Sequence, residues 1–342
     1  MAITLKDIAE KAGVSASTVS RVLNNDTKDM VNTETAQNVI YWAEKLEYSS
    51  YTEKNDRDMK NIGCILSEVT SKFDHPYFSI IIEKIETELK DRGHKLAFLE
   101  IEEEIKQEGN IDEILNQPLD GAISISEHLS NKIYKKIIKK TDNIVFIGNR
   151  FNKYDKDTVY VDRKKAVYKG ITYLIKQGHK KIAFIGGDIF PVSMNVSMKK
   201  TTRFLGYKKA MLEAGLDIND DLIEKGNWKV ENGYNAIEKI IDRANPTAVF
   251  ISSDQMAIGA LRALHNREIN VPADISIISY DNIKMSKFTN PPLTTIDVPK
   301  DDLALMAINI LLMRIEGKLN LPCNVELPTK LIKRESVSKL VK

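Results

Sequence analysis

The sequence predicts an all-α unit at the N-terminus, followed by a larger α/β region with parallel sheets. At 342 residues the chain exceeds one ordinary domain, so two or three folding units are expected. In the first fifty residues, apolar side chains recur at helical spacing. From residue 61 onward, short apolar runs alternate with amphipathic segments, as strands and helices do in α/β proteins. With 42% hydrophobic and 29% charged residues, the chain can bury a core of normal size.

Capping residues divide the first fifty residues into three short helices. Thr4, followed three residues later by an aspartate, predicts the start of a helix. Gly13 ends that helix, because a residue with positive φ is needed there. Ser15 is placed to cap a second helix over residues 16–23, and a third helix is expected over about 33–46. The result is a compact three-helix unit.

The spacing of Ala9, Gly13 and Val19 is that of a helix-turn-helix. The small residue lets two helices approach, the glycine makes the tight turn, and the β-branched residue locks the second helix in place. The outer side of that second helix carries small and hydroxyl side chains with one long cation, Arg21. Such a surface suits a helix that enters the major groove of DNA. A plain helical hairpin joined by glycine is the alternative interpretation.

Bulk charge and composition set further limits. Residues 1–50 contain five basic and seven acidic side chains, so the DNA-binding prediction rests on the pattern of side chains and not on net charge. Charge appears by residue 6, and no apolar run approaches ~18 residues. Cys64, Cys323 and the five histidines show no metal-ligand spacing. We therefore expect a cytoplasmic protein with no membrane segment, no metal site and no cofactor.

The region after residue 61 predicts two similar α/β halves. The predicted strands cover residues 62–69, 96–101, 121–125, 144–147, 159–161, 182–185, 248–251 and 275–280, and the predicted helices include residues 76–92, 164–177, 202–214 and 255–267. A similar phrase occurs at residues 91–98 and 177–184, in each case a helix end, a glycine and a strand. Ligands of parallel sheets bind beyond the C-terminal ends of the strands, so two facing sheets would enclose a cleft.

Two phrases in the first helices closely resemble one known family. Residues 4–15, TLKDIAEKAGVS, and residues 18–24, TVSRVLN, are similar to the DNA-binding headpiece of the lactose/galactose repressor family of bacterial transcription regulators. The resemblance implies that Ala16, Ser17 and Arg21 read bases. It also implies contacts with the DNA backbone for the polar residues Thr4, Ser15, Thr18, Ser20 and Asn24.

Residues 49–60, SSYTEKNDRDMK, form a polar linker that departs from the pattern of this family. In the family the segment usually forms a hinge helix that inserts a leucine into the minor groove. Here Arg57 stands about where that leucine belongs, and the usual Pro-Asn start is missing. Met59 is a candidate substitute for the leucine. A DNA-inserting hinge and a solvated linker are therefore both open.

The rest of the chain resembles the same family over nearly its whole length. The similar phrases cover residues 179–187, 203–207, 253–260, 271–276 and 291–296. The implied fold is a two-lobed α/β domain like that of periplasmic sugar-binding proteins, in which the chain crosses between lobes near residues 161, 290 and 323. The implied organisation is a headpiece over 1–48, a linker over 49–60, a first lobe over about 61–160 and 293–322, and a second lobe over about 161–291 and 323–342.

The resemblance also implies an effector site between the lobes. Arg203 matches an arginine that binds sugar hydroxyls, and Asp281 matches the carboxylate opposite it, which suits polyols because each hydroxyl both donates and accepts. Trp228 matches an aromatic that packs on the apolar face of a pyranose. The weaker matches are Tyr77 and Phe78, an aromatic pair of the purine-responsive branch, together with Asn149, Tyr160 and Ser253. Simpler interpretations are core or rim packing for the aromatics, a surface ion pair for Arg203 and a helix cap for Asp281.

These features predict a homodimeric repressor that releases operator DNA when a sugar binds, with galactose or a galactoside favoured. An alternative within the family is a purine-type regulator in which the ligand tightens DNA binding. An enzyme or a solute-binding protein is a third hypothesis. It is weakened because the sequence contains no P-loop, nucleophile elbow, metal cluster or GxGxxG motif, and a transport receptor would need a signal peptide.

Overall fold

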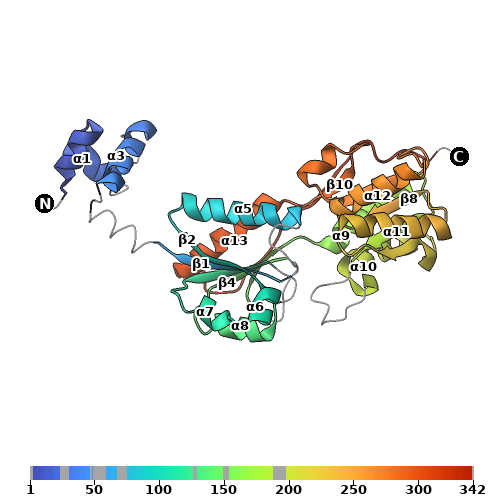
Figure 1. The fold of residues 1–342 in the computed structure, drawn as a ribbon, viewed down its shortest axis with the longest axis horizontal. Helices are drawn as coiled ribbons and strands as arrows, with labels where there is room; N and C mark the ends of the chain where they lie inside the picture. Colours follow the sequence, from blue (N-terminus) through green and yellow to red (C-terminus); the bar gives the residue numbers. More distant parts are fainter. Residues whose placement is uncertain are drawn as a thin grey trace. The chain divides into compact units, whose positions relative to one another are not determined.

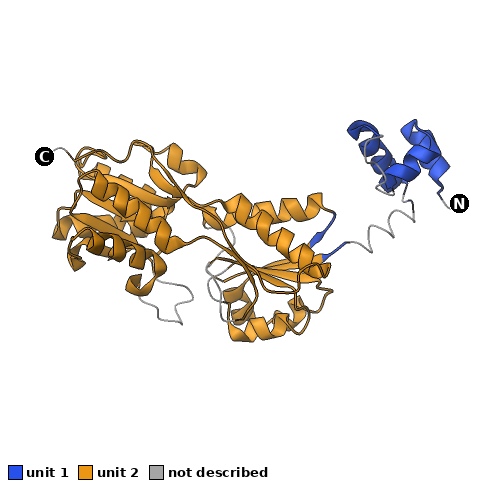
Figure 2. Cartoon of the chain, turned by 180° about the vertical axis from the view of Figure 1, so that it is seen from behind, with its two compact units in different colours: residues 1–60, 93–95 blue, residues 61–92, 96–342 orange. Residues whose placement is uncertain are grey.

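The computed structural model contains two compact units. The described residues are 3–23, 31–46, 48, 59–67, 75–125, 129–148, 154–187 and 198–340. One unit comprises residues 1–60 with 93–95, and the other comprises residues 61–92 with 96–342 (Figure 2). The three-helix headpiece, described up to Tyr48, belongs to the first unit, and both α/β lobes belong to the second (Figure 1).

The headpiece consists of α1 (Leu5–Ala12), α2 (Ala16–Leu23) and α3 (Thr33–Lys45). Thr4 is the N-cap of α1, because the Asp7 carboxylate accepts 2.7 Å hydrogen bonds from both its backbone N–H and its hydroxyl. Gly13 ends α1 with a φ of 69°, in the left-handed region that favours glycine. Ala9 and Val19 are 7% and 0% exposed, so the helix-turn-helix spacing predicted from the sequence packs as expected.

The first lobe is a six-stranded sheet with helices on both faces (Figure 1). Its strands, in spatial order, are β11 (Asn324–Glu326), β5 (Asp157–Tyr160), β4 (Ile144–Gly148), β3 (Gly121–Ile125), β1 (Asn61–Leu66) and β2 (Lys95–Ile101). One face carries α5 (Pro76–Asp91) and α13 (Lys300–Ile315), and the other carries α6 (Glu102–Glu108), α7 (Ile111–Ile114) and α8 (Asn131–Ile137). Strands β3 and β4 are entirely buried, as expected for strands covered on both faces.

The second lobe repeats this design. Its strands, in spatial order, are β12 (Lys330–Ile332), β10 (Thr294–Asp297), β9 (Ser276–Asp281), β8 (Ala248–Ile251), β6 (Ile182–Gly186) and β7 (Ile223–Lys225). One face carries α9 (Arg163–Lys176) and α10 (Thr202–Glu213), and the other carries α11 (Val230–Arg243) and α12 (Asp254–Asn266). Three short 3₁₀ turns are η2 (Met198–Lys200), η3 (Asp220–Leu222) and η4 (Lys284–Lys287). Strand β12 pairs antiparallel with β10, whereas β6 to β10 pair in parallel.

The two lobes share one topology, but the repeated phrase in the sequence does not mark equivalent places. Numbered within each lobe, the first five strands lie in the order 2-1-3-4-5. The phrase at 91–98 leads into β2 at the sheet edge, whereas the phrase at 177–184 leads into the interior strand β6. What they share is a helix end, since Gly93 and Gly178 both adopt positive φ, 72° and 97°.

The crossings between lobes differ from two of the predicted positions. The first lies between Tyr160 and Arg163. Strand β10 belongs to the second sheet and α13 to the first lobe, so the second crossing lies after Asp297, not near 290. Strand β11 pairs with β5 in the first sheet, so the third crossing lies between Glu326 and Lys330, not near 323. The second segment of the first lobe therefore begins after β10, and it includes β11.

Three further observations concern the described part of the chain. No helix there is long and apolar enough to span a bilayer. Within the same residues, no group of three or more His, Cys, Asp or Glu side chains is placed to hold a metal ion. Cys64 and Cys323 are both free thiols, the first buried and the second half-buried.

Candidate functional site

Hydroxyl side chains and one arginine occupy the outer side of α2. Ser15, the residue before the helix, accepts a 3.1 Å hydrogen bond from the backbone N–H of Thr18. Its hydroxyl also lies 2.7 Å from that of Ser17 and 2.8 Å from that of Thr18. Arg21 is exposed and is the one charged residue in this helix. A helix N-terminus with several hydroxyls suits a phosphate, and an exposed arginine one turn further along suits a base edge.

The remaining DNA-binding residues predicted by the resemblance vary in exposure. Thr4 is exposed, but its hydroxyl is engaged with Asp7, and these hydrogen bonds lower the pKa of the Asp7 carboxyl. Ala16 and Ser20 are half-buried at the edge of the α2 surface. Asn24 lies outside the described residues, as does the linker segment 49–58. The choice between a hinge helix and a solvated linker therefore stays open.

The predicted effector residues lie at the C-terminal ends of the two sheets. Asp281 is the last residue of β9, Tyr160 is the last residue of β5, and Trp228 follows β7. Arg203 is the second residue of α10, and Tyr77 is in the first turn of α5. Parallel α/β sheets bind their ligands at this edge, where helices begin and strands end.

Arg203 is held between two aromatic rings. Its guanidinium carbon lies 4.9 Å from the ring centroid of Trp228 and 4.9 Å from that of Tyr280. Gly187 leaves room for the indole, since a Cβ there would lie 2.4 Å from the ring of Trp228. Trp228 also has a φ of 69°, a costly conformation for a bulky residue. Arg203 thus lies over the indole and makes cation-π contacts with two aromatic rings. This differs from the simpler interpretation, in which Arg203 forms an ion pair at the surface.

Asp281 is a buried carboxylate surrounded by charge. It is 3% exposed and has a φ of 109°, so its backbone is strained. Burial, and then the charge of Asp254, raises its pKa to about 7, while Arg203, Lys300 and Arg163 act in the opposite direction. This carboxyl therefore changes protonation near neutral pH, unlike an exposed aspartate.

A second buried carboxylate, Asp254, accepts hydrogen bonds from several elements of the same region. It accepts hydrogen bonds from the hydroxyls of Ser279 at 2.5 Å and Thr295 at 2.7 Å. The backbone N–H of Ile283 donates a third at 2.7 Å, so Asp254, and not Asp281, ties down the turn that follows β9. Burial raises the pKa of Asp254 to about 6. Asp254 therefore links α12, β9 and β10 directly behind Asp281.

The first lobe contributes aromatic side chains from the start of α5. Tyr77 and Phe78 meet edge to face, with ring centroids 5.0 Å apart, and Phe78 meets the His75 ring at 5.5 Å. His75 is the N-cap of α5, since its Nδ1 accepts a 3.3 Å hydrogen bond from the backbone N–H of Tyr77. Burial, and then the charge of Arg203, lowers the pKa of His75 to about 4. His75 is therefore neutral at pH 7.

Two basic residues at this site were missed in the sequence. Lys300 is 8% exposed, and its Nζ donates hydrogen bonds to the carbonyls of Asp281 at 2.5 Å and Val298 at 3.0 Å. Arg163 is 6% exposed and lies near enough to influence Asp281. Each is the first residue of a helix, where a cation meets the positive end of the helix dipole. A basic residue at the first position of a predicted helix is the signal by which the sequence could have pointed to these two residues.

The other predicted effector residues are not brought into this cluster. The buried Ser253 hydroxyl caps α12 by accepting a 3.2 Å hydrogen bond from the backbone N–H of Met256. Tyr160 is half-buried, and its carbonyl accepts from the N–H of Leu327. Within the described residues, no hydrogen bond or ring contact joins either side chain to Arg203. Asn149 lies outside the described residues.

Comparison with known proteins connects both surfaces to one family. The description "Bacterial regulatory proteins, lacI family" matches residues 4–50, and "Periplasmic binding protein-like domain" matches residues 171–337. The HTH-type transcriptional repressor PurR of Histophilus somni (strain 2336) is 34% identical over 350 residues, which covers 98% of this chain and 99% of the relative. The HTH-type transcriptional repressor MelR of Bacillus subtilis (strain 168) is 33% identical over 351 residues, which covers 98% of this chain and 97% of the relative.

A solved structure supports the same assignment. The complex of the transcriptional regulator CelR with cellobiose matches 98% of this chain and 99% of its own, at 26% identity and a TM-score of 0.71. The predicted headpiece and two-lobed domain are confirmed by these matches, and the family consists of regulators, not enzymes. The chain belongs to the LacI family and is a DNA-binding transcriptional repressor.

Proposed function

We propose that this repressor binds its operator as a homodimer in the cytoplasm and releases it when a small sugar binds between the lobes, with galactose or a galactoside favoured. The observation that carries the proposal is Arg203, whose guanidinium carbon lies 4.9 Å from the ring centroids of both Trp228 and Tyr280, near the buried Asp281. A fixed cationic donor next to a carboxylate suits a polyol, because each hydroxyl both donates and accepts. The CelR structure, a cellobiose complex of the same architecture, is consistent with a sugar effector.

Operator binding is assigned to α2, with Arg21 as the base-reading cation. Arg21→Ala is expected to cost about 1–3 kcal/mol at each half-site, so a dimer loses at least about 2 kcal/mol, or roughly thirtyfold in operator affinity. Fluorescence anisotropy with the DNA upstream of the protein's own gene measures this loss. Lys45→Ala removes an exposed cation from the last turn of α3 and is the matched charge control. Equal losses in the two variants would show that Arg21 acts only through bulk charge.

Effector binding is assigned to Arg203 and Asp281. Calorimetry with galactose, galactosides, glucosides and purine bases identifies the ligand, and a gel shift with and without it gives the direction of the response. Arg203→Ala and Asp281→Ala should bind operator normally and fail to release it. Lys209→Ala, an exposed cation on the same helix as Arg203, is the control. Normal release by Arg203→Ala would contradict the assignment.

A purine-type regulator, in which ligand tightens DNA binding, is the second candidate. Two observations favour it: the edge-to-face pair of Tyr77 and Phe78 at the start of α5, and the repressor relatives named PurR. Calorimetry decides between the two. If only a purine base binds, and if it strengthens the operator complex in the gel shift, the sugar proposal is replaced.

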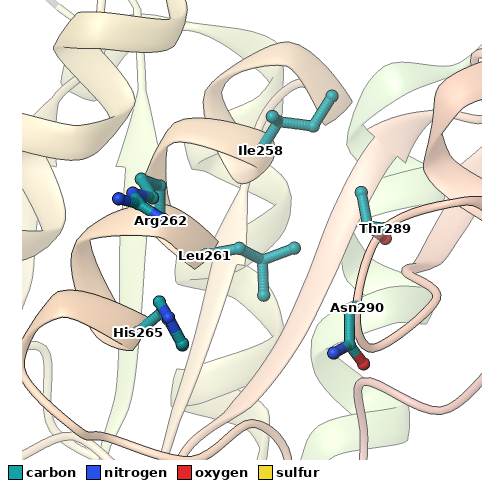
Figure 3. A pocket seen from close by; sticks show the side chains of 6 residues that line it. All are labelled: Ile258, Leu261, Arg262, His265, Thr289 and Asn290. Atoms are coloured by element: carbon teal, nitrogen blue, oxygen red, sulfur yellow. The ribbon is translucent and has the colours of Figure 1, made fainter.

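The proposed homodimer has a candidate contact face on α12. An open pocket of about 340 Å³ is lined by Ile258, Leu261, Arg262 and His265 of this helix and by Thr289 and Asn290. In Figure 3 the Leu261 side chain points towards Thr289 and Asn290. Met285 and Phe288 lie in and directly after η4, just before Thr289 in the chain, and they are 56% and 65% exposed. Exposed apolar side chains beside an open pocket are typical of a surface that another protein covers.

A two-fold dimer would present two headpieces to the two halves of an operator. Phe288→Asp should shift the purified protein from dimer to monomer in sedimentation experiments and weaken operator binding. The control is Leu321→Asp, which replaces an apolar side chain that is 78% exposed, more than Phe288, in the segment between α13 and β11. A Phe288→Asp protein that remains dimeric would exclude this face.

A further inference from the structure

We propose that the effector carries an anionic group, a phosphate or a carboxylate, bound among Arg163, Arg203 and Lys300. This inference rests on the proposed function, because it names the class of ligand taken by the same effector site. It goes further in one respect: a neutral sugar such as galactose would be the weaker ligand, and a sugar phosphate or sugar acid the stronger one.

The first observation is that three helices begin with a cation at one point. Arg163 is the first residue of α9, Lys300 the first of α13 and Arg203 the second of α10. Arg163 and Lys300 are buried, and Arg203 is half-buried between its two rings. The charges of all three act on the same carboxyl, Asp281, so they surround one location that includes groups from both lobes.

This placement is unfavourable for the protein alone. The N-terminus of a helix carries a partial positive charge, which repels a cation in the first turn. Neither α9 nor α10 has an acidic residue in its first turn, although Asp162 caps α9. Burial of a cation adds a desolvation cost. The first turn of α13 does contain Asp301 and Asp302. The positive helix ends are therefore those of α9 and α10, and they add to the three basic side chains in one positive region. An anion is the ligand that such a region binds.

The two buried carboxyls of the site are fewer than its three cations. Arg203, Lys300 and Arg163 all act on Asp281, and Lys300 also acts on Asp254. Burial raises the pKa of both carboxyls, so neither is a full negative charge at every pH near neutrality. Asp254 is also committed to three protein donors on β9, β10 and the following turn. Among the described residues at this place, the two buried cations and the half-buried Arg203 therefore outnumber the two buried carboxyls, whichever way the carboxyls share their protons.

Two buried donors at the same place have no acceptor among the described residues. They are the hydroxyl of Tyr280, a residue that is 1% exposed, and the Nε of Arg203. The charges that act on this hydroxyl belong to Arg203, Arg163 and Asp281, so it lies within the cluster. A buried donor without a partner is costly. An oxyanion offers only acceptors and satisfies both donors, whereas a sugar hydroxyl also brings a donor that needs an acceptor of its own.

The test compares matched neutral and anionic probes on the full chain. Calorimetry pairs galactose with galacturonate and galactose 6-phosphate, and glucose with glucuronate and glucose 6-phosphate. A sugar-free arm compares sodium sulfate with sodium chloride at equal ionic strength in thermal unfolding. We expect the anionic member of a binding pair to bind at least tenfold tighter than its neutral partner. Sulfate at about ten times its Kd should raise the Tm by roughly 2–4 °C more than chloride.

Variants separate this site from a general salt effect. Arg163→Gln and Lys300→Gln should lose the additional sulfate effect and the tenfold preference, while Lys209→Gln on the exposed side of α10 keeps both. Arg163→Lys retains the charge and should keep the response, which covers the case in which the neutral variant does not fold. A purely structural role for Arg163 would lower the Tm without changing the ratio of anionic to neutral affinity.

The outcomes also distinguish this inference from the proposed function. A neutral sugar that binds as tightly as its acid or phosphate, or a sulfate effect equal in all variants, overturns the anionic effector. If that neutral sugar still releases the operator, the proposed function stands. If no sugar of either kind changes operator binding, the proposed function fails, and the sulfate arm still reports separately on the anion site.

Discussion

Acidification should destabilise the α/β unit through one histidine. His75 caps α5 beside Phe78 and Arg203, and burial together with the Arg203 charge lowers its pKa from 6.5 to about 4. Between these two values the unfolded chain binds a proton on His75 that the folded chain does not. The contribution of His75 to the free energy of unfolding therefore falls as the pH drops from about 6.5 to about 4, and it is fully present above that window.

The size of this effect follows from the pKa difference. At about 1.4 kcal/mol for each pH unit, a pKa lowered from 6.5 to about 4 corresponds to roughly 3 kcal/mol. Several kcal/mol is a large part of the stability of an ordinary domain. The loss should be half complete near pH 5 and should stop below about pH 4 for this group.

The assay is urea unfolding of the wild-type protein and of His75→Asn at intervals from pH 7.5 to pH 4.5. Asparagine keeps an oxygen acceptor for the first turn of α5 but has no charge to gain. Carboxyls titrate in both proteins, so their contribution cancels in the difference. The wild-type protein should lose roughly 3 kcal/mol relative to the variant across this range. A difference that does not change with pH would refute the reasoning.

The remaining predictions concern one ion pair and one glycine. Arg314→Met should lower the free energy of unfolding by about 3–5 kcal/mol, because the buried Asp157 loses a bidentate partner at 2.6 and 2.8 Å. Arg243→Met, which breaks a more exposed pair, should cost at most about 1 kcal/mol in the same urea experiment, and equal losses would contradict this view. Gly187→Val should displace the Trp228 indole, since its Cβ would lie 2.4 Å from the ring. The effector affinity measured by calorimetry should then fall, while the operator affinity stays unchanged. An unaltered effector affinity would contradict a role of Trp228 in effector binding.

The headpiece was predictable because its signals are local. Thr4, Gly13 and Ser15 each act on backbone groups within four residues of themselves, and the structure places them at the helix ends that the sequence predicts. Long buried strands were similarly predictable, and the bounds of β3 and β8 match the predicted runs at 121–125 and 248–251. A continuous apolar run is itself the signature of a strand covered on both faces.

The crossings were not predictable because they depend on distant pairing. Strands β11 and β12 contain three residues each, and every one of these residues is exposed or half-buried, so neither strand carries a buried apolar run. Which sheet receives each strand is decided by its partner, β5 for one and β10 for the other. Those partners lie far away in the sequence. As a result, the predicted lobe boundaries placed β10 in the first lobe and β11 in the second, whereas the structure has the reverse.

The cluster proposed as the effector site contains both residues that the sequence singled out and residues that it did not. Arg203, Trp228 and Asp281 stand in distinctive phrases, and the structure brings Arg203 to the other two. Lys300 and Tyr280 have no motif, and their importance arises only once β9 and α13 are placed beside each other. A lysine that opens a long helix conflicts with the helix dipole, and such conflicts are worth examining in any sequence.

The positions of Arg163 and Lys300 suggest how the proposed effector would change the orientation of the two lobes. An effector changes a conformational equilibrium only by binding one arrangement better than another. Arg163 begins the helix that follows the first crossing, and Lys300 begins the helix that follows the second, with its Nζ on the carbonyl of Asp281. A ligand held by both is therefore anchored on the two lobes at the points where the chain passes between them, and its hydrogen bonds cannot be equally good in two lobe orientations. A coupling of about 1–3 kcal/mol is typical of allosteric repression, and one or two charge-assisted hydrogen bonds made in a single orientation supply it. Because β1 follows the linker at Asn61, the first lobe is the one to which the headpiece is attached.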